Sequence, residues 1–125
     1  MKTIILSLLL SICSVGIING QEIMPEFIGG QAKLYQFIGD NIKYPVSARK
    51  NGVSGNVVVQ FDVNKDGALT NIQTVRGPGY GLDEEAMRVV QLMDHMWIPG
   101  SKDGIPVTVR FTLPIKFVLG PIKKT

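Results

Sequence analysis

The sequence has few side chains of the kinds that carry out chemistry: one cysteine and one histidine in 125 residues. Cys13 lies in an apolar N-terminal stretch that we expect to be removed, so the mature chain would have no disulfide and no thiol chemistry. His95 stands beside Asp94, but no serine or cysteine has a nucleophile-like setting, and a lone histidine falls short of a structural zinc site. We therefore interpret His95 and Asp94 as surface-loop residues.

Sites for ions and nucleotides are incomplete as well. Asp62–Gly67 matches the start of a calcium-binding EF-hand loop, but the twelfth position is Gln73 where a glutamate is needed, and strand patterns flank it. The glycine-rich loop Gly77–Gly81 places Leu82 at the third glycine position of a dinucleotide-binding loop, and the acidic run Asp83–Glu85 that follows would repel a phosphate. These carboxylates are also too close together in sequence for a glycosidase pair. We expect no metal, no cofactor, no small-molecule substrate and no enzymatic activity.

Charge gives no sign of nucleic-acid binding. The formal net charge is +3, from 13 basic and 10 acidic residues. The basic residues are scattered from Lys33 to Arg110 and form no stripe or cluster with aromatic stacking partners, as nucleic-acid binding would require.

The N-terminus reads as a targeting signal. Lys2 precedes the short apolar run Ile4–Ile12, and small residues follow, with cleavage expected after Gly20 or Gly16. Counted generously, the apolar stretch 4–18 reaches about 22 Å as a helix, which is shorter than the roughly 30 Å of a bilayer's hydrocarbon core. We interpret residues 1–20 as a cleaved signal peptide rather than a membrane anchor.

Hydrophobic periodicity predicts the remaining elements. Val57, Val59, Phe61 and Val63 alternate as one buried face of a strand, whereas Leu69 and Ile72 cannot share a face without a β-bulge. Pro114 lacks a ladder donor, so its strand is expected at a sheet edge. The expected elements are an extended arm at Glu22–Gly29, helices at Gln31–Ile42, Val46–Lys50 and Leu82–Met93, and strands at Gly55–Val63, Ala68–Arg76 and Val107–Leu119.

This order predicts an α+β fold, namely a three-stranded antiparallel sheet packed on one face by two helices. A hairpin followed by a helical return, with a right-handed crossover, places the last strand beside the first. That arrangement leaves one edge of the last strand open.

Several short motifs in this order resemble the C-terminal domain of the TonB family. They are Tyr44-Pro45, the strand 57–63 with the Asp66-Gly67 turn, Leu82–Ala86, Trp97–Gly100, Gly104–Val107 and Pro114–Phe117. The residues that define the motif are Tyr44, Pro45, Gly55, Gly67, Trp97, Pro99, Gly100 and Pro114. The resemblance divides the chain into a signal peptide (1–20), an arm with an amphipathic helix (21–43), a TonB C-terminal-like domain (44–119) and a tail (120–125).

The resemblance implies a periplasmic binding module that supports transmembrane transport. In this family the domain pairs its sheet edge with an extended segment of an outer-membrane TonB-dependent transporter, which is β-augmentation. The matching edge residues here are Val107, Thr108, Val109, Arg110, Phe111, Thr112 and Leu113. The alternative is a self-associating or scaffolding periplasmic domain without a transport role, with a homodimer formed through the same edge.

One departure from the family concerns energy coupling. A TonB energy transducer carries an inner-membrane helix and a long proline-rich spacer, and this sequence shows neither pattern. The eleven residues from Asn19 to Gly29 reach at most roughly 40 Å. The resemblance therefore leaves open any coupling to an inner-membrane energy source.

The signal-peptide interpretation predicts a mature protein that begins near Gln21. N-terminal sequencing of the protein from a periplasmic fraction checks this. Recovery of a chain that still starts at Met1, in the membrane pellet, would contradict it.

Overall fold

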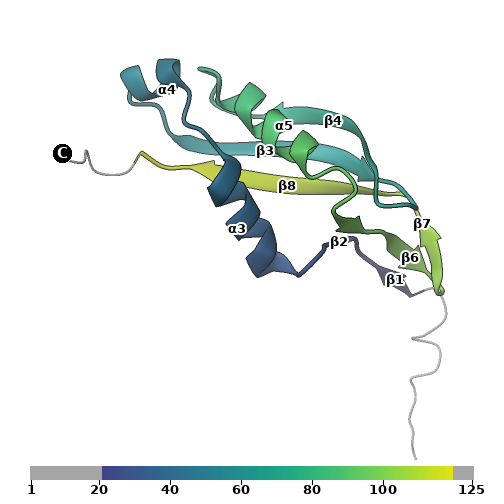
Figure 1. Ribbon diagram of the computed structural model, residues 1–125. Coiled ribbons are helices and arrows are strands. Elements are labelled where there is room, and N and C mark those ends of the chain that lie inside the picture. Colours follow the sequence, from purple (N-terminus) through teal and green to yellow (C-terminus); the bar gives the residue numbers. More distant parts are fainter. Residues whose placement is uncertain (1–20, 120–125) are drawn as a thin grey trace, which may run out of the picture.

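The computed structural model describes residues 21–119 (Figure 1). The signal peptide expected at 1–20 and the tail at 120–125 lie outside the described residues. The elements are β1 (Glu22–Ile23), β2 (Glu26–Phe27), α3 (Gln31–Asn41), α4 (Val46–Lys50), β3 (Gly55–Val63), β4 (Leu69–Arg76), α5 (Leu82–Leu92), β5 (Trp97–Ile98), β6 (Gly100–Lys102), β7 (Ile105–Val107) and β8 (Val109–Phe117). The expected α+β class with antiparallel pairing is confirmed.

The main sheet has the strand order β4-β3-β8, and all its pairs are antiparallel. β3 and β8 pair without a register shift from Gly55↔Phe117 to Val63↔Val109. The alternating apolar residues of β3 are buried, as their period of two predicts. From β8, Leu113, Ile115 and Phe117 extend the same buried face.

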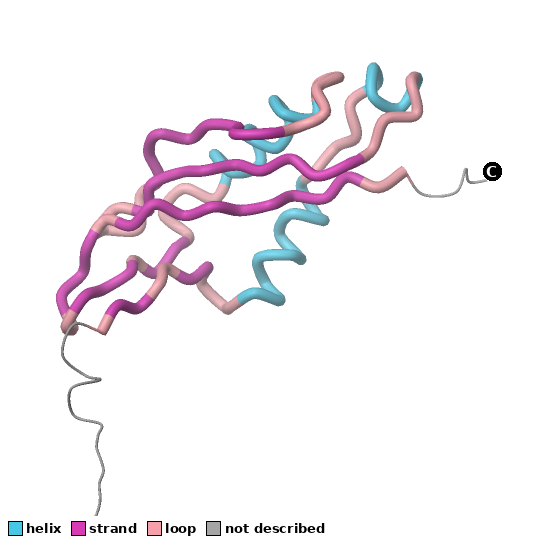
Figure 2. Tube along the Cα trace, turned by 180° about the vertical axis from the view of Figure 1, so that it is seen from behind, coloured by secondary structure: helices cyan, strands magenta, loops and turns pink. Residues whose placement is uncertain are grey.

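The helices lie on one face of this sheet, as the opposite views of Figures 1 and 2 show for α3 and α5. α5 buries one side, because its apolar residues recur every three or four positions. These residues are Leu82, Ala86, Val89 and Val90, with Met93 just beyond the helix. α3 adds Leu34 and Ile38 to the same core, and the short α4 adds Ala48. Within residues 21–119, no helix is long and apolar enough to cross a membrane.

β4 contains the bulge that the sequence predicts. Its pairing with β3 shifts between Gln60 and Asp62, opposite the segment that holds Asn71 and Ile72. Asn71 has a positive φ of 52°, a conformation that asparagine tolerates better than most residues. The expected bulge is therefore confirmed, and a second shift follows between Val58 and Val59.

The prediction of one long last strand at Val107–Leu119 was wrong about where this strand begins and ends. Asp103 and Gly104, both with positive φ, form a turn that folds β6 and β7 into a hairpin with Gly100 opposite Val107. Val107 therefore pairs with β6, Thr108 lies between two strands, and β8 begins only at Val109. Two of the seven expected edge residues thus fall outside the edge strand.

The N-terminal arm, expected only to be extended, contains two short strands that pair with other strands of the chain. β1 pairs with β6, and β2 pairs with β5 through Phe27↔Trp97. Phe27 is buried, and its ring lies 5.8 Å from that of Phe37 in α3. Strands of two residues are too short to show a period, which is why the sequence does not predict them.

Polar contacts fasten the end of α3 to α5. Glu85 Oε2 accepts a hydrogen bond from the Lys43 backbone N–H at 2.7 Å, and Arg88 Nη2 donates to the Asn41 carbonyl at 2.8 Å. Arg88 also pairs with Glu85 at 2.7 Å. The hydrogen bond from Arg88, assisted by the one from Lys43, holds the pKa of the Glu85 carboxyl below its usual value, against the effect of burial.

The turn between β3 and β4 requires glycine at position 67. Gly67 has φ of 86°, and a Cβ built there would lie 2.6 Å from the Trp97 carbonyl oxygen. Its N–H donates to the Asn64 carbonyl at 2.9 Å. Backbone strain and a collision with fixed backbone therefore both oppose a side chain here.

Replacing Glu85 by glutamine is expected to lower the free energy of unfolding by about 1–2 kcal/mol near neutral pH, because a charge-assisted hydrogen bond is lost. The folded-state pKa lies below the unfolded value of about 4.5. The carboxylate's contribution is thus present above that value and is lost as the pH falls through the folded pKa. Urea unfolding between pH 7 and pH 3 measures the difference, which should shrink in acid. Glu84→Gln, an exposed neighbour, is the control; a constant difference at every pH would contradict the assignment.

Alanine at Gly67 is expected to lower stability more than alanine at Gly104. Both glycines have similar positive φ, but a Cβ at Gly104 meets nothing within 4 Å. We expect Gly104→Ala to cost about 1 kcal/mol from strain alone, and Gly67→Ala at least about 2 kcal/mol. Thermal and urea melts of the two variants compare them. Equal losses would show that the close approach to Trp97 does not matter.

Candidate functional site

The outer edge of β8 is the regular open edge of the main sheet. Across residues 21–119, β8 pairs only with β3, through nine consecutive residue pairs. Pro114 stands opposite Val58, and a proline is accommodated where its nitrogen faces away from the partner strand. Along an antiparallel strand, backbone N–H groups point alternately toward the partner strand and away from it. Thr112 and Arg110 lie two and four residues before Pro114, so they have the same orientation as Pro114 and direct their backbone N–H groups outward.

The opposite edge of the sheet, β4, is a poor template for a further strand. Its two register shifts interrupt the regular spacing of backbone donors and acceptors. Bulges of this kind are a common way to protect an edge strand from pairing with another chain. The sheet is therefore asymmetric: β4 is irregular and β8 is regular.

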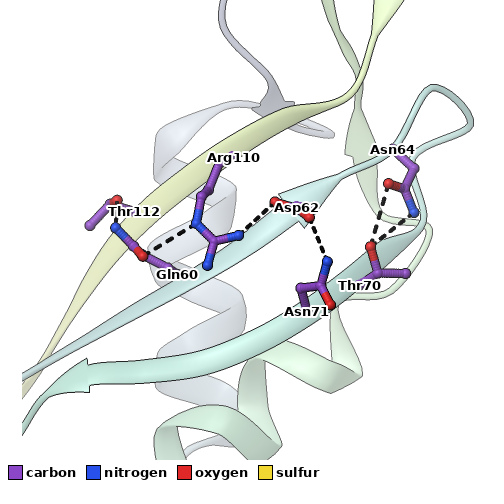
Figure 3. A network of polar contacts seen from close by, with 7 residues as sticks. All are labelled: Gln60, Asp62, Asn64, Thr70, Asn71, Arg110 and Thr112. Atoms are coloured by element: carbon purple, nitrogen blue, oxygen red, sulfur yellow. Dashed lines mark hydrogen bonds and ion pairs between the residues drawn. The ribbon is translucent and has the colours of Figure 1, made fainter.

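Side chains on the polar face of β8 are held by β3 (Figure 3). Arg110 forms an ion pair with Asp62 at 2.9 Å, and its Nε donates to Gln60 Oε1 at 3.3 Å. Gln60 Nε2 in turn donates to the Thr112 hydroxyl at 3.1 Å. Arg110 and Thr112, expected on the solvent face, do lie there, but their side chains point along the sheet toward β3. At this edge, the backbone groups of β8 are therefore more available to a partner than the side chains of Arg110 and Thr112.

Two hollows lie between β8 and α3, on the core side of the edge. They have volumes of about 390 and 530 Å³, and Tyr35 and Pro114 line both. The first is also lined by Pro25, Glu26, Phe27, Gln31, Leu34, Trp97, Phe111, Thr112 and Leu113. The second is also lined by Ile38, Gly39, Ile42, Asn56, Ile115 and Lys116. The sequence analysis did not predict these hollows, because no local pattern fixes the position of α3 against β8. Tyr35, an exposed tyrosine on α3, was the signal that could have indicated them.

Trp97 lies at the centre of an aromatic cluster beside the first hollow. Only 3% of its surface is exposed. Its ring centroid is 5.7 Å from that of Phe27, 5.4 Å from Phe61 and 5.1 Å from Phe111. Its Nε1 is buried without a hydrogen-bond partner among the described residues. Among the five expected edge residues that fall in β8, Phe111 contributes its ring to this cluster.

The other residues of the expected motif lie at packing contacts, at turns and at the ends of strands and helices. The Tyr44 hydroxyl donates to the Val53 carbonyl, and its ring meets that of Phe117 edge-on at 5.7 Å. Pro45 immediately precedes α4. A Cβ at Gly100 would lie 2.8 Å from the Ile23 carbonyl oxygen, so glycine lets the arm approach. Gly55 begins β3, and Pro99 separates β5 from β6.

The other candidate sites have ordinary structural explanations. His95 Nδ1 lies 3.3 Å from Asp94 Oδ2 with both side chains exposed, and Asp94 Oδ1 accepts a hydrogen bond from the Leu69 N–H at 2.8 Å. Asp66 Oδ1 accepts one from the Ala68 N–H at 3.1 Å within the β3–β4 turn. In the described part of the chain, no group of three or more histidine, cysteine, aspartate or glutamate residues is placed to hold a metal ion.

Comparison with known sequences gives consistent matches. Residues 40–119 match the family model described as the Gram-negative bacterial TonB protein C-terminal. The chain is 28% identical over 88 residues to Protein TonB of Helicobacter pylori strain 26695, and 31% identical over 78 residues to Protein TonB of Vibrio cholerae. These matches cover 70% and 62% of this chain but only 29% and 31% of the relatives. The chain therefore aligns with about three tenths of the length of these relatives.

Solved structures give the same result. Two NMR solution structures of the Helicobacter pylori TonB C-terminal domain resemble this chain, with TM-scores of 0.56 and 0.54 and identities of 26% and 28%. The similarity covers 73% and 70% of this chain, and 81% and 90% of those structures.

Proposed function

The chain belongs to the family of Gram-negative TonB C-terminal domains, and from this premise we propose that it is a periplasmic binding module for outer-membrane TonB-dependent transporters. It pairs the edge of β8 with an extended transporter segment by strand addition, and in this way supports transmembrane transport. Export follows from the proposed signal peptide at residues 1–20. The module binds and does not catalyse.

The observation that carries the proposal is the regular, unpaired edge of β8 beside the bulged β4. Strand addition uses main-chain hydrogen bonds for affinity, and it needs an edge with evenly alternating donors and acceptors. β8 provides such an edge from Val109 to Leu113, which refines the expected 107–113 by removing its first two residues. The side chains of Arg110 and Thr112 are already bound to β3, which favours recognition through the backbone.

Proline at Thr112 or Arg110 is expected to abolish binding. Each substitution removes an outward amide donor and leaves the β3 ladder intact, because these amides face away from β3. Isothermal titration calorimetry with peptides from extended segments of TonB-dependent transporters of the same organism measures the loss. Thermal melts establish that each variant folds.

Two variants separate the backbone from the side chains. Thr112→Val keeps the amide and loses only the hydroxyl, so binding should persist. Arg110→Ala should cost less than about 1 kcal/mol of binding free energy, because an exposed charge contributes little in water. Sedimentation velocity with and without peptide tests pairing with a second copy at the same edge. If both proline variants fold and bind with unchanged affinity, β8 is not the binding edge.

A further inference from the structure

We propose that α3 and β2 form a side wall of the binding edge, which selects apolar side chains at two alternate positions of the added segment. The inference rests on the proposed function and concerns its specificity. α3 begins at Gln31, whereas the family model matches only from residue 40 onward. Most of α3 therefore lies outside the residues that the family model matches.

The position of α3 gives it access to an added strand. In Figures 1 and 2, α3 crosses β8, and its N-terminal part extends past the edge of the sheet. Both hollows lie between this helix and β8. A strand paired to the outer edge of β8 would place alternate side chains on the core side of the sheet, where α3 and β2 lie.

The spacing of the hollows fits two such side chains. On β8, the first hollow is lined by residues 111–114 and the second by 114–116, so the midpoints of these two stretches lie about two to three residues apart. Same-face side chains of a strand recur every two residues, at about 6.7 Å. One added strand would thus fill both hollows with residues i and i+2.

The linings differ in the side chain that they suit. Phe27, Trp97 and Phe111 surround the first hollow with aromatic rings, which suits a large apolar group. Ile38, Ile42 and Ile115 line the second, which suits an aliphatic group. The second hollow also has open space at Gly39, where an added Cβ would meet nothing within 4 Å.

Tyr35 stands between the two hollows. Its side chain accepts a hydrogen bond from Gln31 Nε2 at 3.0 Å, and the residue remains 53% exposed. An exposed tyrosine with a fixed orientation offers contact area at low entropic cost, and aromatic residues are enriched in interface cores. We assign the transporter segment as the occupant that covers Tyr35, because the unpaired backbone of β8 beside it can hydrogen-bond to an extended chain.

Filling the second hollow tests the inference without disturbing the core. Gly39→Leu adds a side chain into open space and replaces a glycine within a helix, so the melting temperature should not fall. The affinity for transporter peptides should fall about tenfold or more, because one peptide side chain loses its burial. Gly39→Ala should have a smaller effect. Tyr35→Ala should weaken binding about threefold to tenfold.

Gln36→Leu is the matched control. It adds the same side chain at an exposed position of the same helix that lines neither hollow, so affinity should remain unchanged. On the peptide side, each residue is replaced in turn by serine. Two positions, i and i+2, should show the largest losses on the wild-type protein, and the loss at one of them should shrink on Gly39→Leu.

The outcomes separate this inference from the proposed function. If wild-type protein binds a peptide and Gly39→Leu and Tyr35→Ala bind it equally well, the wall is not a specificity element, while strand addition stands. If Gly39→Leu changes only the self-association of the protein, a second copy occupies the hollows and the inference is overturned. If no peptide binds the wild-type protein, the proposed function fails and the inference fails with it.

Discussion

The packing of Trp97 against three phenylalanine rings holds together parts of the chain that lie far apart in sequence. Phe27 comes from the N-terminal arm, Phe61 from the central strand and Phe111 from the edge strand. Buried aromatic contacts of this kind contribute both apolar area and a preferred ring geometry. Through Phe27 and its further contact with Phe37, the cluster also packs against the middle of α3. The edge strand β8 and the helix α3 are thus both tied to the same buried ring.

The two edges of the main sheet are built differently, and this difference explains why an open strand is tolerable. A sheet with two regular edges presents two templates for pairing with other chains. Here β4 carries two register shifts and a residue with positive φ, Asn71, so its edge is irregular. β8 keeps nine pairs in unbroken register with β3. A strand added to this sheet would therefore meet a regular edge on one side only.

Much of the fold follows from local patterns, whereas the details of the site do not. The alternation from Val57 to Val63 and the helical spacing from Leu82 to Val90 each report burial of one face, so β3 and α5 are predictable from the sequence. The break at Thr108 is not, because Val107 and Val109 continue the same alternation although they pair with different strands. The hollows beside β8 depend on how α3 crosses the sheet, which is set by contacts such as Glu85 to Lys43, 42 positions apart in the chain.

Trp97 is the only tryptophan in the sequence, and it lines the first hollow while nearly all of its surface is buried. Tryptophan emission responds to the polarity of its surroundings and to nearby quenching groups. The indole fluorescence of the unlabelled protein therefore comes from a single residue, which lies beside the hollow next to β8. We expect the wavelength and intensity of this emission to change when that hollow is filled.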